Sequence, residues 1–100
     1  MEKHTAHYAL KVVKAVVAQR GADAFTRLAL QGIDAMGLRQ AEGLAVVLQL
    51  QAGMLYKSMT THADPTVWQD VYHAPCPNGK VAYIKVTVQA GATVIQFKEK

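Results

Sequence analysis

The residues of this chain that could do chemistry are concentrated between Leu55 and Tyr72 and in the strand-like segment that follows. Lys57 could supply a fixed positive charge or a proton, Gln69 an amide that donates and accepts hydrogen bonds, and Tyr83 a phenolic hydroxyl. Together these groups suit cleavage of an RNA phosphodiester bond without a metal ion, because RNA brings its own nucleophile, the 2′-hydroxyl. The protein then has to help remove one proton, neutralise charge on the phosphorane and protonate the departing 5′-oxygen.

Each of these three residues also has an ordinary structural interpretation. Lys57 could be a plain surface lysine, Tyr83 a half-buried strand tyrosine and Gln69 an amide at a strand edge. Residue types and spacing alone leave both interpretations open.

The sequence offers little support for metal-dependent or nucleophilic catalysis. Four histidines and one cysteine show no spacing such as C-x-x-C or H-x-x-x-H, and His4 and His7 suggest at most a surface pair. Cys76 stands between two prolines in a predicted turn, and we expect its thiol to have no catalytic role. The sequence contains no glycine-rich phosphate loop, no G-x-S-x-G and no convincing carboxylate pair. We therefore expect no metal site and no cofactor.

Length and composition predict one small folded domain. A chain of 100 residues with 51% hydrophobic content allows one modest core, so a single domain over residues 1–100 is expected. The net charge of +4 and the pI of about 9.4 favour encounters with polyanions, although simple solubility explains them equally well. No apolar run could cross a bilayer and no signal peptide is evident, so with one lone cysteine we expect a cytoplasmic protein without membrane contact.

Three helices are expected in the first half of the chain. The first should stop at Gly21, the second should run from a Thr26 cap to Gly37, and the third from about Arg39 to Leu50. The apolar positions that predict their inner faces are Leu10, Val13, Val16 and Val17, then Leu30, Ile33 and Met36, then Leu44, Val47 and Leu48.

Strands are expected after Pro65, where the hydrophobic period changes to two. Val67–Tyr72 and Lys80–Gln89 are the clearest candidates, joined by a turn at His73–Gly79, and a last strand follows a turn at Gly91. Helices first and an antiparallel sheet second predict an α+β fold. The segment Gln51–Met59 stays open between a helix end, a turn and a short strand.

The alternation divides the predicted sheet into two faces. In the longest strand Ala82, Ile84, Val86 and Val88 point one way and Val81, Tyr83, Lys85 and Thr87 the other, while Thr93, Ile95 and Phe97 alternate with Val94, Gln96 and Lys98. The polar face could be ordinary solvated surface, which pattern alone favours. It could also be a platform for nucleic acid, with tyrosine stacking on bases and lysines binding phosphates.

The stretch that begins at Tyr56 closely resembles the MqsR family, the mRNA-cleaving toxins of bacterial toxin–antitoxin pairs. The matching residues are Tyr56-Lys57-Ser58-Met59-Thr60-Thr61, Asp64, Thr66, Trp68-Gln69-Asp70-Val71-Tyr72, Lys85-Val86-Thr87-Val88, Phe97-Lys98-Glu99-Lys100, Met1-Glu2-Lys3, Thr5 and His7. The resemblance covers nearly the whole chain, weakly in the helices and strongly from Tyr56 on. A near-contiguous string that includes a tryptophan is far more specific than a short motif.

The resemblance implies a RelE-like α+β fold, with N-terminal helices packed on one face of a C-terminal antiparallel sheet. It implies a ribosome-independent, metal-independent endoribonuclease that cuts mRNA at a short GCU-like sequence and so stops translation and growth. It also implies a cognate antitoxin of the MqsA kind, with a zinc-binding part and a DNA-binding helix-turn-helix part. The toxin would then meet DNA only through its antitoxin.

The family's catalytic lysine, glutamine and tyrosine fall on Lys57, Gln69 and Tyr83. Tyr83 is placed by counting back from Lys85, because the loop before Lys80 is one residue longer than the family pattern. This count puts the tyrosine and Lys85 on one strand face.

Three further residues are expected to contact RNA: Lys85, His62 and His73. His73 stands where the family pattern has arginine, and it could bind phosphate, act as the missing base or be a plain loop histidine. His62 has the same ambiguity.

Two other classes of function fit the same sequence. A non-catalytic RNA-binding domain that blocks translation by occupancy would show the same sheet face and charge. A pure protein-interaction partner would have no effect on growth when expressed alone.

Overall fold

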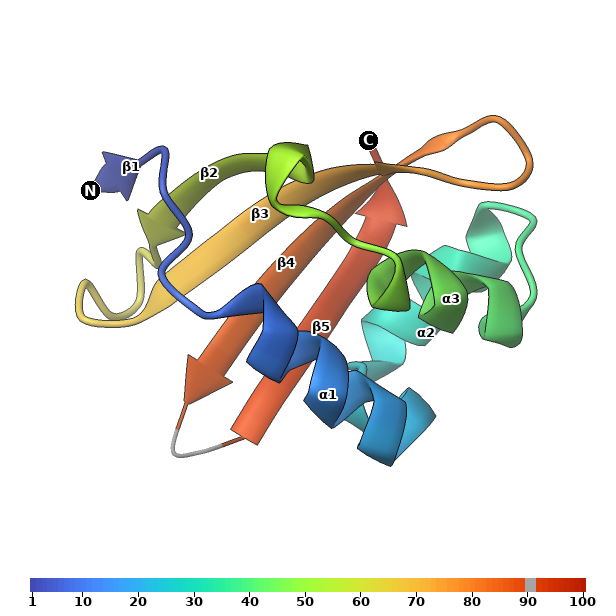
Figure 1. The fold of residues 1–100 in the computed structure, drawn as a ribbon, viewed down its shortest axis with the longest axis horizontal. Helices are drawn as coiled ribbons and strands as arrows, with labels where there is room; N and C mark the ends of the chain where they lie inside the picture. Colours follow the sequence, from blue (N-terminus) through green and yellow to red (C-terminus); the bar gives the residue numbers. More distant parts are fainter. Residues whose placement is uncertain (90–91) are drawn as a thin grey trace.

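The computed structural model describes residues 1–89 and 92–100. Their elements are, in chain order, β1 Glu2–Lys3, α1 Leu10–Arg20, the short 3-10 helix η1 Gly21–Ala24, α2 Arg27–Ala35, α3 Gln40–Leu48, the 3-10 helix η2 Ala52–Met54, β2 Leu55–Thr60, β3 Trp68–Pro75, β4 Val81–Gln89 and β5 Ala92–Glu99. Neighbouring strands pair antiparallel in the order β1-β2-β3-β4-β5, and the helices gather toward the β5 side (Figure 1). The expected α+β class is confirmed.

The helix ends largely follow the predicted signals. α1 is followed by Gly21 at a φ of 59°, and the hydroxyl of Thr26 accepts a 3.0 Å hydrogen bond from the Ala29 amide at the start of α2. The prediction that Leu48 is buried was wrong, because its side chain is 36% exposed. The predicted burial of Val47 is confirmed, and α3 buries Val46 beside it. Leu48 is the next residue along the helix and points about 100° away from Val47.

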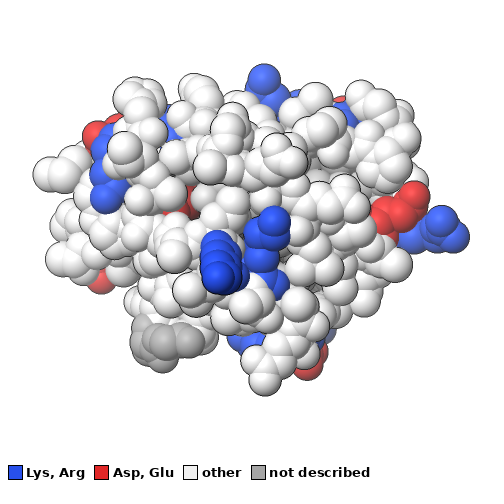
Figure 2. Space-filling view, viewed as in Figure 1, with Lys and Arg blue, Asp and Glu red and all other residues white. Residues whose placement is uncertain are grey.

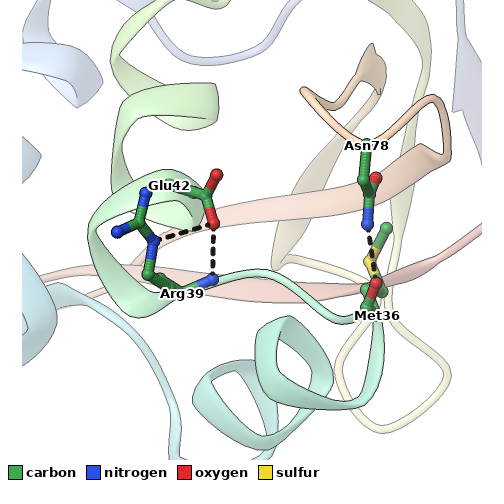
Figure 3. Close-up of polar contacts among 4 residues, drawn as sticks. All are labelled: Met36, Arg39, Glu42 and Asn78. Atoms are coloured by element: carbon green, nitrogen blue, oxygen red, sulfur yellow. Dashed lines mark hydrogen bonds and ion pairs between the residues drawn. The ribbon is translucent and has the colours of Figure 1, made fainter.

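Side-chain hydrogen bonds fix the segments around α3, as Figure 3 shows. The backbone amide of Arg39 donates to Glu42 Oε1 at 2.8 Å, which satisfies an amide at the start of the helix and lowers the pKa of the Glu42 carboxyl. The side-chain amide of Asn78 donates to the carbonyl of Met36 at 2.8 Å. The turn between β3 and β4 is thereby tied to the end of α2.

Strand β3 runs further than the sequence suggested. His73 belongs to it, so the prediction of a turn from His73 onward was wrong, and the turn is confined to Cys76–Gly79. The Cys76 amide donates to the carbonyl of Lys80 on the β4 side, so the Pro75 nitrogen faces the β2 side of the strand. Pairing with β2 has already ended at Tyr72, so the missing amide hydrogen of Pro75 costs no hydrogen bond of the sheet. His73 is therefore a strand residue with a defined direction.

The core joins the helices to one set of alternating strand residues. Its members include Val13, Val17, Ile33, Met36, Val47, Leu50, Tyr72, Ala82, Ile84, Val86, Ile95 and Phe97. The predicted inward set of β4 is confirmed at Ala82, Ile84 and Val86, while Val88 at the strand's far end is only partly buried. Tyr83 and Lys85 stay outside the core, so the strand parity counted from the sequence is correct.

A buried carboxylate anchors the N-terminal segment to the sheet. Asp70 is 1% exposed and accepts hydrogen bonds from the backbone amides of His7 and Tyr8 at 2.8–3.0 Å. The hydroxyl of Ser58 donates to the same carboxylate at 2.6 Å. These donors replace the water that a buried charge loses. Burial and the nearby Asp70 charge also raise the pKa of Tyr72 to about 12.

The segment left open by the sequence, Gln51–Met59, forms η2 and most of β2. Strand β1 was not anticipated and pairs with β2, Glu2 lying opposite Met59. The turn predicted at Gly91 lies outside the described residues. None of the described helices has the length and apolar character that a membrane crossing requires.

Candidate active site

The polar side of the sheet, opposite the core, is called here the outer face. Its side chains from β2 to β5 are Tyr56, Lys57, Gln69, His73, Tyr83, Lys85, Gln96 and Lys98. Cross-strand partners in an antiparallel sheet point to the same side, which groups these residues by register. Lys57, Gln69 and Tyr83 come from β2, β3 and β4 in turn, and all three lie on this one face.

Two lysines flank the centre of the outer face. Lys57 and Lys85 both pair with Val71, one from each neighbouring strand, so their Cα atoms lie roughly 10 Å apart. Val71 itself is fully buried although it points to the outer face. The side chains around it therefore close over the strand and form a continuous surface.

Lys57 is held by an acidic residue of β1. Its ammonium lies 2.8 Å from Glu2 Oε1, and its side chain is 21% exposed against 56% for Glu2. The hydrogen bond and the opposite charge raise the pKa of Lys57 and lower that of Glu2. The lysine is thus a fixed cation whose partner is exposed and can be displaced by a phosphate.

Three aromatic rings lie side by side next to this lysine. His73 stacks on Tyr56 with 4.4 Å between ring centroids and an interplanar angle of 20°, and its ring centroid lies 5.6 Å from that of Tyr83. The ammonium of Lys57 is 5.5 Å from the centre of the Tyr56 ring, so one phenol ring neighbours both Lys57 and His73. A register shift between Leu55 and Lys57 places Tyr56 at a bulge, a local device that redirects side chains.

Burial of His73 and the positive charge of Lys100 lower the pKa of the imidazole below its ordinary value of 6.5. The imidazole is therefore neutral at pH 7 and can accept a proton.

Positive charge continues across the outer face beside Tyr83. The ammonium groups of Lys85 and Lys98 lie 5.8 Å and 5.1 Å from the centre of its ring. Lys98 pairs with Tyr83 across the β4–β5 ladder. Tyr83 therefore sits among cations that suit a polyanionic ligand.

Gln69 occupies the next row of the face. Its side-chain amide donates to the hydroxyl of Thr87 at 3.4 Å. Thr87 is only 8% exposed, although it lies on the side of the sheet away from the core. The weak hydrogen bond orients the amide and leaves its oxygen available to a ligand.

His62 lies apart from the cluster around Tyr83. It is exposed in the loop between β2 and β3, which precedes the first residue of β3, whereas His73 lies near the last. The length of β3 between the two separates them by roughly 16 Å or more. The structure thus brings together Lys57, His73, Tyr83 and Lys85 but not His62.

Sequence reasoning missed two contributors to the cluster. Tyr56 is 51% exposed and was noted only as part of the matching string, and Lys98 only as one of the polar strand residues. The alternation of Lys98 with Phe97 placed it on the correct face, but nothing in the sequence indicated its approach to Tyr83.

Across residues 1–89 and 92–100, no three His, Cys, Asp or Glu side chains gather as ligands for a metal ion. Cys76 is buried, and burial raises the pKa of its thiol, which suits an incidental cysteine better than a nucleophile. Figure 2 shows the molecule from the side seen in Figure 1, where Lys and Arg side chains lie in several separate groups. Two cations of the N-terminal half are engaged structurally, since Lys14 donates to the Leu50 carbonyl and Arg20 to that of Asp23.

Comparison with known proteins relates the chain to a protein family and to an individual protein. Residues 5–99 match the family described as "Motility quorum-sensing regulator, toxin of MqsA". The chain is also 42% identical over 100 residues to the mRNA interferase toxin MqsR of Escherichia coli (strain K12), and the alignment covers the full length of both proteins.

Proposed function

The chain belongs to the MqsR toxin family, and we propose that it cuts mRNA at a short GCU-like sequence without the ribosome and without a metal ion. As a member of this family it is an mRNA interferase, an endoribonuclease that acts as the toxin of a toxin–antitoxin pair. The observation that carries the proposed mechanism is the common orientation of Lys57, Gln69 and Tyr83. Three separate strands present an amine, an amide and a phenol on one polar face.

The reaction we propose is transfer of the phosphoryl group to the 2′-oxygen of the same nucleotide. Neutral His73 takes the proton of the 2′-hydroxyl, and the new bond from this oxygen to phosphorus forms as the bond to the 5′-oxygen breaks. Lys57 neutralises the charge on the phosphorane, and the Tyr83 hydroxyl gives its proton to the departing 5′-oxygen. The products are a 2′,3′-cyclic phosphate and a 5′-hydroxyl.

The remaining side chains of the outer face would hold the RNA. Gln69 accepts a hydrogen bond from a base edge through its amide oxygen, or donates the second hydrogen of its amide nitrogen to the phosphate. Lys85 and Lys98 contact phosphate groups, with Tyr56 exposed for stacking. His62 would contact the RNA only at a distance from the cut phosphate, since it lies in the loop that follows β2.

We also propose a biological setting, which the family membership supports. The protein would be a single RelE-like toxin domain of the cytoplasm, its helices covering one sheet face and its outer face left for RNA. Its antitoxin would be of the MqsA kind, zinc-binding and with a helix-turn-helix, so that contact with DNA is indirect.

The decisive experiment is cleavage of a purified transcript by the purified protein in EDTA, with the ends mapped by primer extension. We expect discrete ends within GCU-like sequences, 2′,3′-cyclic phosphate termini, and no cleavage by Lys57→Ala. Lys11→Ala, which removes an exposed lysine of α1, is the matched control and should cut at the normal rate. Cleavage by Lys57→Ala at the wild-type rate, or complete loss of wild-type activity in EDTA, would refute the mechanism.

The same experiment distinguishes the non-catalytic alternative. An inhibitor that blocks translation by occupancy would bind the transcript through the same lysines and tyrosines but leave no new ends.

A further inference from the structure

We propose that a pocket between α2 and β5 holds one nucleobase of the RNA, next to the phosphate that is cut. The inference rests on the proposed function and adds a site that reads sequence. The pocket has a volume of about 270 Å³ and is lined by Thr26 and Leu28 of the α2 start, Tyr83 and Lys85 of β4, and Gln96 and Lys98 of β5. It therefore shares Tyr83 with the proposed catalytic cluster and opens directly beside it.

The pocket exists because α2 lies close against β5. Thr26 donates its backbone amide to the carbonyl of Ile95 at 3.0 Å, and Phe25 forms a parallel bridge with Ile95. Between one and two turns further along α2, Gly32 lies against the backbone of Phe97, where an added Cβ would overlap the carbonyl oxygen. This close approach makes the first turn of α2 the outer wall of a groove beside the sheet.

The size and the walls of the pocket favour a flat heterocycle. Pockets for drug-sized ligands run from about 300 to 1,000 Å³, so a volume near 270 Å³ suits one ring system rather than a longer segment. Leu28 is 76% exposed and faces the pocket with Ala29, while the phenol of Tyr83 forms part of the opposite wall. Apolar and aromatic walls of this kind bind a base by stacking and contact.

The polar groups at the pocket suit base recognition. Gln96 is exposed, and its side-chain amide makes no hydrogen bond with any described residue. An amide that can donate and accept at once is the usual partner of a base edge. Lys85 and Lys98 at the rim match the phosphates on either side of the base. A peptide of acidic residues would use these lysines but gain nothing from the apolar and aromatic walls.

The test is a cleavage assay with short RNAs that share one mapped cut site and differ by a single base around it. Two variants alter the pocket, Gln96→Ala and Leu28→Ser. Two controls make comparable changes elsewhere. Gln31→Ala repeats the glutamine change on the exposed side of α2, and Val12→Ser replaces a 60% exposed apolar side chain of α1 by serine. The fluorescence of the single tryptophan, Trp68, shows whether each variant is folded.

We expect Gln96→Ala to lower kcat/KM on the preferred RNA by about tenfold or more and to remove discrimination at one base position while the other positions keep theirs. Leu28→Ser should weaken discrimination at the same base position, and both controls should behave as wild type. If both pocket variants keep the full discrimination, or lose activity equally on every RNA, the pocket does not read a base. A wild-type protein that cuts no RNA would instead refute the proposed function itself.

Discussion

The exposed carboxylate of Glu2 lies 2.8 Å from the ammonium of Lys57, although the two residues are 55 positions apart in the sequence. Strand β1 pairs with β2 at its edge, with Glu2 opposite Met59 and Lys3 opposite Ser58, and so carries an acidic side chain over the lysine proposed to face the phosphate. The free protein thus keeps the Lys57 ammonium paired. A substrate phosphate has to displace the carboxylate or share the lysine with it.

Replacement of the acidic partner should therefore improve RNA binding. In Glu2→Gln the competing negative charge is gone, and we expect KM to fall by up to about fivefold, the range of an exposed ion pair, with kcat little changed. Steady-state cleavage of a short RNA at low salt measures both constants. Glu99→Gln, which removes a carboxylate 3.7 Å from Lys80, is the control for net charge. Equal effects of the two substitutions would show that the Glu2–Lys57 contact has no specific role.

The pH dependence of cleavage should report His73. A proton acceptor must be neutral, and because burial and Lys100 lower the pKa of this imidazole, kcat/KM should stay level from pH 7 down to a value below 6.5. Below the pKa the rate should fall about tenfold per pH unit. His73→Gln should lower kcat by about 10²-fold or more and abolish this acid limb.

Several charged or titratable groups lie next to His73 or next to the two tyrosines beside it, and they could mimic this profile. They are Tyr56 and Lys57 of β2, Tyr83 and Lys85 of β4, and Lys98 and Lys100 at the end of the chain. All are phenols or amines, and none is an imidazole or a carboxylic acid, the groups that could produce an acid limb. His4→Gln, at an exposed position of the N-terminal segment, should leave the limb intact. An unchanged limb in His73→Gln would exclude His73 as the base.

The salt dependence of RNA binding should count the lysines that contact phosphate. Each contact to single-stranded nucleic acid contributes about 0.7 to the slope of log K against log salt. Lys85→Ala and Lys98→Ala should each weaken binding of every RNA and reduce the slope by about that amount. Fluorescence anisotropy with an RNA that carries a 2′-deoxy nucleotide at the cut site measures binding without cleavage. A slope unchanged in both variants would place the RNA elsewhere.

The stability of the N-terminal segment should depend on Asp70. Its carboxylate accepts hydrogen bonds from two backbone amides and the hydroxyl of Ser58, and removal of the carboxylate leaves buried donors without partners. We expect Asp70→Ala to lower the free energy of unfolding by about 3 kcal/mol. Trp68, whose ring stacks on His7 at 5.1 Å, reports unfolding in a urea titration by fluorescence.

Asp34→Ala is the matched control for this substitution, because Asp34 is an exposed carboxylate on α2. Asp34→Ala should change the free energy of unfolding by no more than about 0.5 kcal/mol. If Asp70→Ala were as stable as this control, the buried hydrogen bonds would contribute nothing to the fold.

Much of the fold followed from patterns that operate over short distances along the chain. The period of two in Lys80–Gln89 fixed which residues enter the core, because successive strand residues point to opposite sides. Thr26 and Gly21 marked helix ends through local hydrogen bonding and a positive φ. The pattern was insufficient at Leu48, whose exposure depends on which side of α3 meets the core, and at His73, where β3 continues to Pro75 because β4 pairs with it.

The sequence by itself determined the class of fold, the two faces of the sheet and the family string that contains Lys57 and Gln69, because all of these are written in neighbouring residues. The tertiary structure alone decided that Glu2 reaches Lys57, that His73 stacks on Tyr56, and that α2 closes a pocket beside Tyr83. These contacts join residues far apart in the chain. Strand register and helix docking set them, and both depend on how the whole core packs.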